Sequence, residues 1–321
     1  MSKRVLFIGG SGEISASCVE QAVLEGHIVS TFNRGQRRVA PSEGVEHISG
    51  DLRDEKTLAS IAKQQYDVIC QFLAFTPDDI ERDVSLFNDN CDQYIFISSA
   101  SAYQKPNQVD LIHEEVPLDN PFWAYSRDKA ASEAALQASP LPFTIVRPSH
   151  TYRERVPSTV IDGKHLLWRL RHNKPIIVHE DGETLWTLTR SEDFARAFTY
   201  LFDNPDAIGE TYHITDSQAH SWNLILSSIA EILEQGIELH PVSTKNLVQY
   251  EPSWEGPLYG DKANNAVFDN TKIAAISDGW QCEISLLEGL QRAISYAIED
   301  DKFTPDKNTD ALVDRIIKEN A

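Results

Sequence analysis

Positive charge is scarce in this sequence. Its 321 residues include 29 lysines and arginines but 49 aspartates and glutamates, which gives a formal net charge of −20 and an isoelectric point near 4.8. A field of this sign repels a phosphate backbone unless a local basic patch overrides it. Nucleic acid is therefore not expected as a primary partner.

Long apolar runs are also missing. The first segment, MSKRVLFIGG, contains an apolar run of only four residues, VLFI, and no later run is long enough to cross a bilayer. We therefore expect neither a secretory signal nor a membrane-spanning helix. The sequence predicts a cytoplasmic protein with no membrane partner.

Cysteine is rare and its spacing is irregular. The four cysteines are Cys18, Cys70, Cys91 and Cys282, and they form no CxxC pair and no zinc-like spacing. Cys18 falls in an expected helix and Cys70 in an expected buried strand. This placement favours reduced thiols in the core, and we expect no metal site.

Short apolar runs alternate with helical patterns over the first 150 residues. The expected strands are 4–8, 27–32, 45–49, 67–74, 94–99 and 143–147, and helical periodicity covers 13–25, 53–64, 78–90 and 123–138. Continuous apolar strands that alternate with helices indicate a parallel sheet covered on both faces. The predicted fold class is α/β, with a doubly wound Rossmann-type parallel sheet that binds ligands at the carboxyl ends of its strands.

The pattern is looser after residue 150. A turn-rich region precedes a short helix candidate, HLLWRLRH, and a strand candidate, KPIIVH. A further helix and strand within 186–215 could still join the sheet. We therefore expect an NAD(P)-binding domain over 1–150 that also receives about 186–215. A smaller mixed α/β substrate-binding domain is expected over 151–321.

A glycine-rich turn, GGSGEIS, follows the first expected strand. Gly9, Gly10 and Gly12 allow a tight turn at the start of a helix, where backbone N–H groups can bind a pyrophosphate. A purely structural turn would also use glycine, but the position between the first strand and first helix favours dinucleotide binding. Ser15 stands where a third glycine is usual, and its side chain should shift the helix slightly or weaken binding.

The second expected strand ends in STFNRGQRR. NAD-selective sites usually carry an acid there, which holds the ribose 2′-hydroxyl, whereas this chain has Asn33 and Arg34, with Arg37 and Arg38 close behind. An arginine can bind a 2′-phosphate, so NADP is weakly favoured over NAD. The alternatives are a solvated basic loop or stacking on adenine. Asp51, after the third strand, is placed either to touch the adenine or to cap a helix.

The stretch YSRDK places Tyr125 and Lys129 four residues apart, on one face of a helix. A free tyrosine titrates too high to be a good base at neutral pH, and a neighbouring ammonium group would lower its pKa. Chance produces this spacing in many chains. The preceding strand adds weight because it ends in Ser98 and Ser99, at the edge where a hydroxyl can hydrogen-bond a substrate carbonyl or alcohol.

With these motifs the chain resembles the short-chain dehydrogenase/reductase superfamily, and especially its extended and atypical branches, the NAD-dependent epimerase/dehydratase family. The segments GGSGEIS, GDLRD, FISSASAY, YSRDK, IVRPSHTY and SEDFARAF follow the family order and cover nearly the whole chain. The resemblance implies that Ser99 orients the substrate and that Tyr125 is the general acid/base. Lys129 would bind the nicotinamide ribose and tune the tyrosine. Ser99 is preferred to Ser98 because it lies four residues before Tyr103, where the family motif places its serine. The expected cofactor contacts are Gly9, Gly10, Ser11, Gly12, Glu13, Ile14, Asn33, Arg34, Asp51, Leu52, Leu73, Ala74 and Lys129.

The chain departs from this family in its substrate region. Nucleotide-sugar enzymes carry an arginine that clamps the diphosphate, and counting back from Asp193 places Trp186 there. An indole cannot replace a charged donor, although it stacks well on a sugar. Packing between the domains is the alternative for Trp186, and Arg190 could serve in place of the missing arginine. His150, which could instead cap a backbone carbonyl, is expected to contact the substrate, as are Trp186 and Tyr103.

The function indicated is an NAD(P)-dependent oxidoreductase of the epimerase/dehydratase type, acting at a hydroxyl or carbonyl carbon of a small sugar-like substrate. One alternative is an NADPH-dependent reductase of a small carbonyl compound. Another is a nonenzymatic NAD(P)-responsive binding protein, because FNRG, SHTY and LWTLT resemble an atypical subgroup that contains chloroplast stem-loop RNA-binding proteins. A homodimer is the family default.

Overall fold

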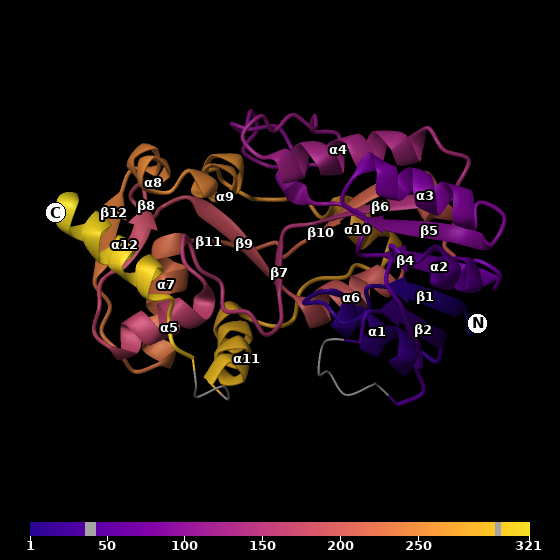
Figure 1. Cartoon of the computed structure of the whole chain (residues 1–321), viewed down its shortest axis with the longest axis horizontal. Helices are drawn as coiled ribbons and strands as arrows, with labels where there is room; N and C mark the ends of the chain where they lie inside the picture. The colour runs from indigo at the N-terminus through magenta and orange to yellow at the C-terminus, as the bar shows by residue number, and fades with distance from the viewer. Residues whose placement is uncertain (36–42, 299–302) are drawn as a thin grey trace.

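The computed structural model describes residues 1–35, 43–298 and 303–321, so Arg37 and Arg38 lie outside the described residues. The chain forms two lobes (Figure 1). The larger lobe contains a parallel sheet with helices on both faces. The smaller lobe is built mostly from the C-terminal half.

Seven parallel strands form the large sheet, in the order β10-β6-β5-β4-β1-β2-β3. They are β1 (Arg4–Ile8), β2 (Ile28–Asn33), β3 (Glu46–Ser49), β4 (Tyr66–Gln71), β5 (Cys91–Ile97), β6 (Phe143–Pro148) and β10 (Thr211–Ile214). All six strands expected in the first 150 residues are present, and the doubly wound parallel fold is confirmed. Because β5 ends at Ile97, the two serines that follow it lie just beyond the carboxyl end of the strand.

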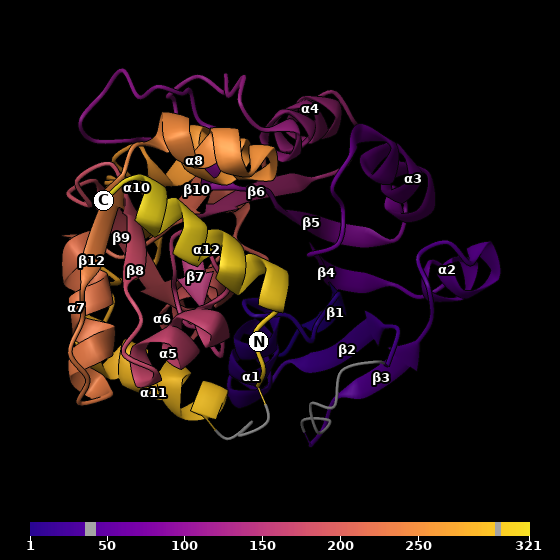
Figure 2. The same ribbon diagram turned by 60° about the vertical axis from the view of Figure 1, so that its left-hand side comes forward.

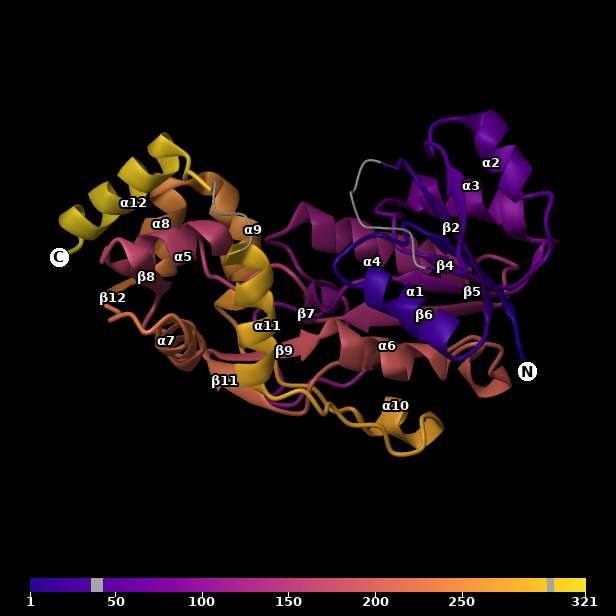
Figure 3. The same ribbon diagram turned by 90° about the horizontal axis from the view of Figure 1, so that it is seen from below.

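The sheet is buried on both faces because its strands direct successive apolar side chains to opposite sides. In β1, Val5 and Phe7 belong to one core, whereas Leu6 and Ile8 belong to the other. The first core is covered by α1 (Ser15–Leu24) and α6 (Ser191–Thr199), and the second by α2 (Glu55–Ile61), α3 (Pro77–Phe87) and α4 (Ala124–Gln137) (Figure 3).

The smaller lobe contains two small sheets and its own core. Its strands are β7 (His150–Tyr152), β9 (Leu185–Arg190) and β11 (Ala219–Ser221) in one sheet, and β8 (Ile176–His179) and β12 (Leu239–Val242) in the other. The other α-helices of the described residues are α5 (Gly163–Arg171), α7 (Trp222–Ile232), α8 (Thr244–Tyr250), α9 (Glu255–Pro257), α10 (Thr271–Ile276), α11 (Leu286–Ile298) and α12 (Lys307–Glu319). All of these except α9 are labelled in Figure 2. Tyr152, Trp186 and Trp222 are among the large side chains of this core.

The segment 186–215 is divided between the lobes. Its first strand, β9, pairs with β7 and β11 of the smaller lobe. Its helix, α6, covers the large sheet, and β10 forms an edge of that sheet, parallel to β6. The chain therefore crosses between the lobes at the carboxyl edge of the large sheet.

The thiols of the structure are free and mostly buried. Cys18, Cys70 and Cys91 are buried, and burial raises the pKa of the Cys70 thiol well above its usual value. Among the described residues, no cluster of His, Cys, Asp and Glu side chains could hold a metal ion. The helices of the same residues include none with the length and apolar character needed to cross a membrane.

Candidate active site

The glycine-rich turn follows β1 and is packed too tightly for side chains at two positions. Gly9 has a φ of +93°, which favours glycine, and its N–H donates to the carbonyl of Phe32 at 2.9 Å. A Cβ on Gly9 would lie 2.6 Å from Cγ of Leu73, and a Cβ on Gly10 would lie 2.7 Å from Cγ2 of Thr31. The turn therefore stays close to the sheet edge, with the N-terminus of α1 directly after it.

Ser15 ties this turn to the start of α1. Its buried hydroxyl donates to the carbonyl of Gly9 at 2.6 Å and accepts from the N–H of Gly12 at 2.7 Å. A glycine at this position could make neither bond. The serine thus fixes the turn, but it also occupies one of the amides that could have faced a phosphate.

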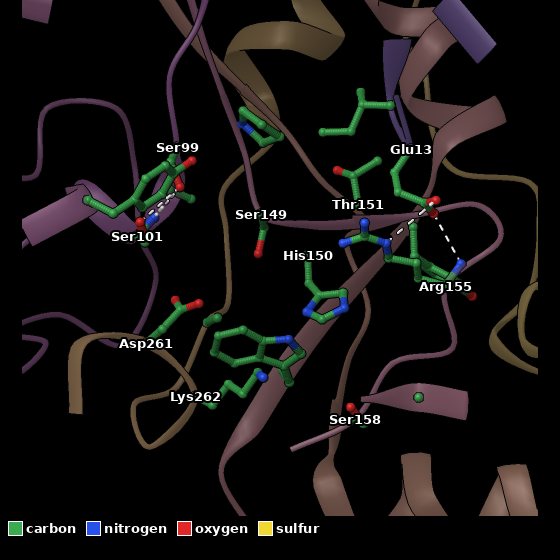
Figure 4. Close-up of a pocket in the computed structure, with 18 of the residues that line it drawn as sticks. Glu13, Ser99, Ser101, Ser149, His150, Thr151, Arg155, Ser158, Asp261 and Lys262 are labelled. Carbon is green, nitrogen blue, oxygen red and sulfur yellow. Dashed lines mark hydrogen bonds and ion pairs between the residues drawn. The ribbon is translucent and has the colours of Figure 1, made fainter. Parts of the chain in front are cut away.

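Glu13 connects the same turn to the smaller lobe. Its Oε2 atom accepts hydrogen bonds from the backbone N–H groups of Arg153, Glu154 and Arg155, at 3.1, 2.9 and 3.1 Å. Converging backbone amides of this kind form an anion-binding nest. Here the chain's own carboxylate fills the nest, and Figure 4 shows Glu13 beside Arg155.

The residues expected near the adenosine lie at the carboxyl ends of β2 and β3. The side-chain carbonyl of Asn33 accepts from the N–H of Gly35 at 2.9 Å, and the Arg34 side chain is exposed beside it. Asp51 accepts from the N–H of Arg53 at 2.9 Å. It therefore stabilises a turn before α2 and does not cap that helix.

Most of the remaining expected cofactor residues surround one cavity of about 290 Å³ beside the glycine turn. Its lining includes Gly9, Gly12, Glu13, Ile14, Leu73, Ser99, Tyr125 and Lys129. Gly10, Ser11, Leu52 and Ala74 are not part of that lining. Ala74 contributes indirectly, since its carbonyl binds Lys129.

The three predicted catalytic residues meet at the edge of this cavity. Tyr125 and Lys129 lie one turn apart on α4, with the lysine Nζ 5.9 Å from the centre of the tyrosine ring. The Ser99 side chain also interacts with Tyr125 and acts to lower its pKa. Lys129 Nζ donates to the carbonyls of Ala74 and Ile97, at 2.7 and 2.8 Å. These bonds fix the lysine at the carboxyl ends of β4 and β5.

Burial dominates the titration of the tyrosine–lysine pair. It raises the pKa of Tyr125, and the interaction with Ser99 opposes this only in part. It also lowers the pKa of Lys129 to about 7, against the opposing charge of Glu133. The expected lowering of the tyrosine pKa is not found in this structure, because desolvation of the buried Tyr125 hydroxyl outweighs the effect of Ser99.

Lys129→Met is expected to change how stability depends on pH. The folded-state pKa of Lys129 lies below its ordinary value of 10.5, so from about pH 7 upward the unfolded chain binds more protons than the folded one. The wild type should therefore gain stability relative to the variant as pH rises toward 10, with a slope of at most about 1.4 kcal/mol per pH unit. Denaturant unfolding across this range measures the difference. Lys245→Met, at an exposed position on α8, is the control, and a pH-independent difference for Lys129→Met would contradict the lowered pKa.

A row of hydroxyl groups orients Ser99 rather than Ser98. The Ser98 hydroxyl is buried and donates to Glu133, whereas the Ser99 hydroxyl lies 2.9 Å from that of Ser101. Ser101 in turn accepts from Ser126 of α4 at 2.8 Å. Ser99 therefore stays the predicted substrate-facing serine, and Ser101 is a further cavity residue that the sequence did not indicate.

Ser99 and Tyr125 also line a larger cavity of about 540 Å³. Figure 4 shows residues of its wall. The large lobe contributes Glu13, Ser99, Ser101, Lys105, Tyr125 and Ser149, and the later segments contribute His150, Arg155, Ser158, Trp186, Asp261, Lys262 and Phe268. Ser99 and Tyr125 line both cavities. They therefore lie where the contents of the two cavities would meet.

Two of the three expected substrate residues line this larger cavity. The His150 ring lies 6.3 Å from that of Trp186 and 6.4 Å from that of Trp222, in edge-to-face contacts. Burial lowers the pKa of His150 to about 3, so its imidazole is neutral at physiological pH. Trp186 is only 1% exposed and packs 5.7 Å from Trp222, so much of its surface serves core packing.

Tyr103 is placed away from both cavities. It is fully buried, and its hydroxyl lies 3.2 Å from Nδ1 of His213 on β10. The Arg147 guanidinium lies over its ring at 4.8 Å. The structure thus places Tyr103 in the buried core of the smaller lobe, directly after the 3₁₀ turn over Ala100–Ala102.

With this geometry in place, comparison with known proteins identifies the family. Residues 5–215 match the model of the NAD dependent epimerase/dehydratase family. The chain belongs to this family. The resemblance inferred from the sequence is confirmed, and with it an NAD-binding Rossmann fold.

The names of the proteins similar to this chain state different functions. The chloroplast stem-loop binding protein of 41 kDa b from Arabidopsis thaliana is 25% identical, over 98% of this chain and 84% of that protein. An epimerase from Methanothermobacter thermautotrophicus has a similar structure, with a TM-score of 0.77 at 16% identity over 94% of each chain. The UDP-glucuronic acid 4-epimerase from Bacillus cereus, solved with UDP-glucuronic acid and NAD, gives 0.73 at 16% identity over 92% of this chain and 99% of that one. At these identities the structures show the fold alone.

The epimerase/dehydratase chain also has cavity residues that the sequence did not indicate. Lys105 follows the 3₁₀ turn, and Asp261 and Lys262 end a π-helical turn over Leu258–Lys262. Single-turn π-helices are rare and occur frequently at functional sites. The available signal was the charged pair in LYGDK, but no spacing rule connects it to the large sheet.

Proposed function

We propose that this chain is an NAD(P)-dependent oxidoreductase of the epimerase/dehydratase type that acts at a hydroxyl or carbonyl carbon of a sugar-like substrate. One observation carries the proposal: Ser99 and Tyr125 line both the cavity beside the glycine turn and the larger cavity. Lys129 is fixed next to them by two backbone carbonyls. This is the arrangement required to move a proton at an oxygen whose carbon exchanges a hydride with a cofactor.

The glycine turn suits a dinucleotide. Gly9 and Gly10 leave no room for a Cβ, and the N-terminus of α1 follows directly, as pyrophosphate binding requires. Asn33, Arg34 and Asp51 would lie near the adenosine. A bound NAD(P) would supply the hydride acceptor and donor, and family membership supports NAD.

The chain's own residues would handle the proton. Ser99, oriented by Ser101, would hold the substrate oxygen by a hydrogen bond. The raised pKa of Tyr125 keeps its hydroxyl protonated near neutrality, so it is prepared to donate to a carbonyl oxygen. In the reverse direction it must become a phenolate, and the charged form of Lys129 would stabilise that state.

The first experiment is the cofactor state of the purified protein. Nucleotide released by denaturation is identified, and the emptied protein is titrated with NADH and NADPH by fluorescence. Tightly retained NAD would support a cofactor-recycling epimerase or dehydratase. An empty protein that binds NADPH well would favour the alternative, a reductase of a small carbonyl compound. Binding of neither nucleotide would contradict both.

Arg34→Ala tests whether the chain also takes NADP. The exposed guanidinium at the end of β2 can pair with a 2′-phosphate. We expect the variant to bind NADPH about tenfold more weakly, the loss of roughly 1.4 kcal/mol, and NADH unchanged. The same fluorescence titration measures both. An equal loss for the two nucleotides would show that Arg34 contacts a part that they share.

A nonenzymatic binding protein is the second candidate, because the similarity to the stem-loop binding protein extends over 98% of this chain. The net charge of −20 opposes RNA as the ligand. Titration of an RNA stem-loop at several salt concentrations would decide this point. The homodimer remains a prediction, and light scattering would test it.

A further inference from the structure

Two lysines in the wall of the larger cavity have few hydrogen-bond partners. Lys105 Nζ donates to Oδ1 of Asn107 at 2.9 Å, and Lys262 Nζ donates to the carbonyl of Thr159 at 2.8 Å. Among the described residues these are the only hydrogen bonds of the two ammonium groups. Since each ammonium group carries three N–H donors, two on each lysine remain for other partners.

The negative charge of one carboxylate, Asp261, acts on both lysines. Burial lowers the pKa of Lys105 and of Lys262, and in each case the charge of Asp261 opposes the change. Burial also raises the pKa of Asp261 to about 6, although both lysines oppose it. Within the described part of the chain, no hydrogen bond to the Asp261 carboxylate is present, and the group lines the cavity together with Lys262 (Figure 4).

The other acidic groups of the cavity are already engaged. Glu13 fills the amide nest of the 153–155 turn, with Arg155 Nε 3.9 Å from its second oxygen. Asp162 accepts from the N–H of Lys164 and caps α5. With all three groups ionised, the two lysines and Asp261 carry one positive charge in excess, and a buried charge is costly unless it is paired.

We propose that Lys105 and Lys262 bind an anionic group of the substrate, a carboxylate or a phosphate monoester, on a polyhydroxylated compound of monosaccharide size. This inference rests on the proposed function in that it treats the larger cavity as the substrate site. Lysine ammonium groups bind either anion as point charges. Asp261 accepts a hydrogen bond from a neighbouring hydroxyl of the same ligand. The cavity of about 540 Å³ is within the range of small-molecule sites.

Aromatic side chains support a ligand with this mixture of groups. Trp123 and Phe268 line the same cavity as the lysines. Their faces suit the apolar side of a sugar ring, while lysine and carboxylate groups suit its substituents. A neutral sugar would leave the excess positive charge unpaired, so the lysines select for an anionic compound.

Calorimetric titration of the purified protein, with NAD present throughout, tests this selection. The probes are D-glucuronate, D-glucose 6-phosphate, inorganic phosphate and D-glucose. We expect at least one anionic sugar to bind about tenfold or more tightly than glucose. Preference for glucuronate alone identifies a carboxylate site, and preference for the phosphorylated sugar, with competition by inorganic phosphate, identifies a phosphate site.

Variants separate this site from nonspecific anion binding. Lys262→Met and Lys105→Met should each reduce the affinity for the preferred anion about tenfold, while the exposed Lys245→Met should have no effect. Asp261→Asn should increase that affinity, because it removes a like charge. Each lysine variant relieves a burial cost, so thermal unfolding is expected to show a folded protein.

The outcomes that overturn the proposal are distinct from those that overturn the proposed function. Glucose binding as tight as that of both anionic sugars, absence of binding by every anionic probe, or an anion preference that survives both lysine substitutions would each reject the lysine site. These titrations require no hydride transfer. A protein that binds the anions but binds neither NADH nor NADPH would instead reject the proposed oxidoreductase.

Discussion

Tyr125→Phe is expected to lower turnover by about 10²–10⁴-fold, the usual contribution of a general acid or base. The substitution removes only the hydroxyl, and the ring keeps its contacts with Phe75 and Trp123. The distances between the ring centres are 6.5 and 5.1 Å, respectively. Lys129 is held by backbone carbonyls and stays in place. Cofactor affinity should therefore change little.

The measurement uses whichever compound, in a panel of sugars and their anionic derivatives, the wild-type protein converts. Rates follow from the amount of product formed, and the cofactor affinity is titrated separately. Tyr200→Phe, at an exposed position after α6, is the matched control and should retain full activity. Turnover that survives in Tyr125→Phe with cofactor bound would exclude the tyrosine as the proton donor and favour a binding protein.

Glu133→Ala is expected to reduce the free energy of unfolding by about 3–5 kcal/mol, because it leaves a buried arginine without its counter-ion. Glu133 Oε2 lies 2.6 Å from Nη2 of Arg147, and the side chains are 1% and 5% exposed. Ser98 also donates to this carboxylate. The pair joins α4 to β6 and is tied to Ser98, the residue before the proposed catalytic serine.

Denaturant unfolding measures the loss. Glu288→Ala is the matched control, since the ion pair of Glu288 with Arg292 is also 2.6 Å long but lies on the surface of α11. Such exposed pairs contribute about 0–1 kcal/mol. If both substitutions lower the free energy of unfolding by the same amount, burial does not determine how much the Glu133–Arg147 pair contributes to stability. The double variant Glu133→Leu/Arg147→Met should recover most of the stability, because it removes both charges together.

The larger lobe could be predicted because short segments of the sequence are enough to identify its strands and helices. Apolar runs such as VLFI and YIFIS are buried on both faces of a parallel sheet, and a sequence with that pattern has few other folds available. The smaller lobe was not predictable in the same way. Its strands, such as β7 and β11, are three residues long and pair with segments far along the chain.

The residues of the candidate site also differ in whether the sequence could predict them. The spacing of Ser99, Tyr125 and Lys129 could be read from the sequence because a strand end and one helix face position all three residues. Asp261 and Lys262 could not, because they lie on a π-helical turn that reaches the cavity only through the packing of the smaller lobe. The direction of the Tyr125 pKa also depends on burial, which neighbouring residues in the sequence do not reveal.

The Glu13 carboxylate has a consequence for communication between the two cavities. It belongs to the glycine-rich turn, yet it is bound by three successive amides of the 153–155 segment, which borders the larger cavity. A ligand that moves this segment would also shift the glycine-rich turn, because the Glu13 hydrogen bonds connect the two. A nucleotide that changes the conformation of the turn would likewise shift the segment. Thermodynamic linkage makes such an effect reciprocal. The hydrogen bonds between Glu13 and the 153–155 amides therefore provide a structural connection through which a ligand in one cavity would change the affinity for a ligand in the other.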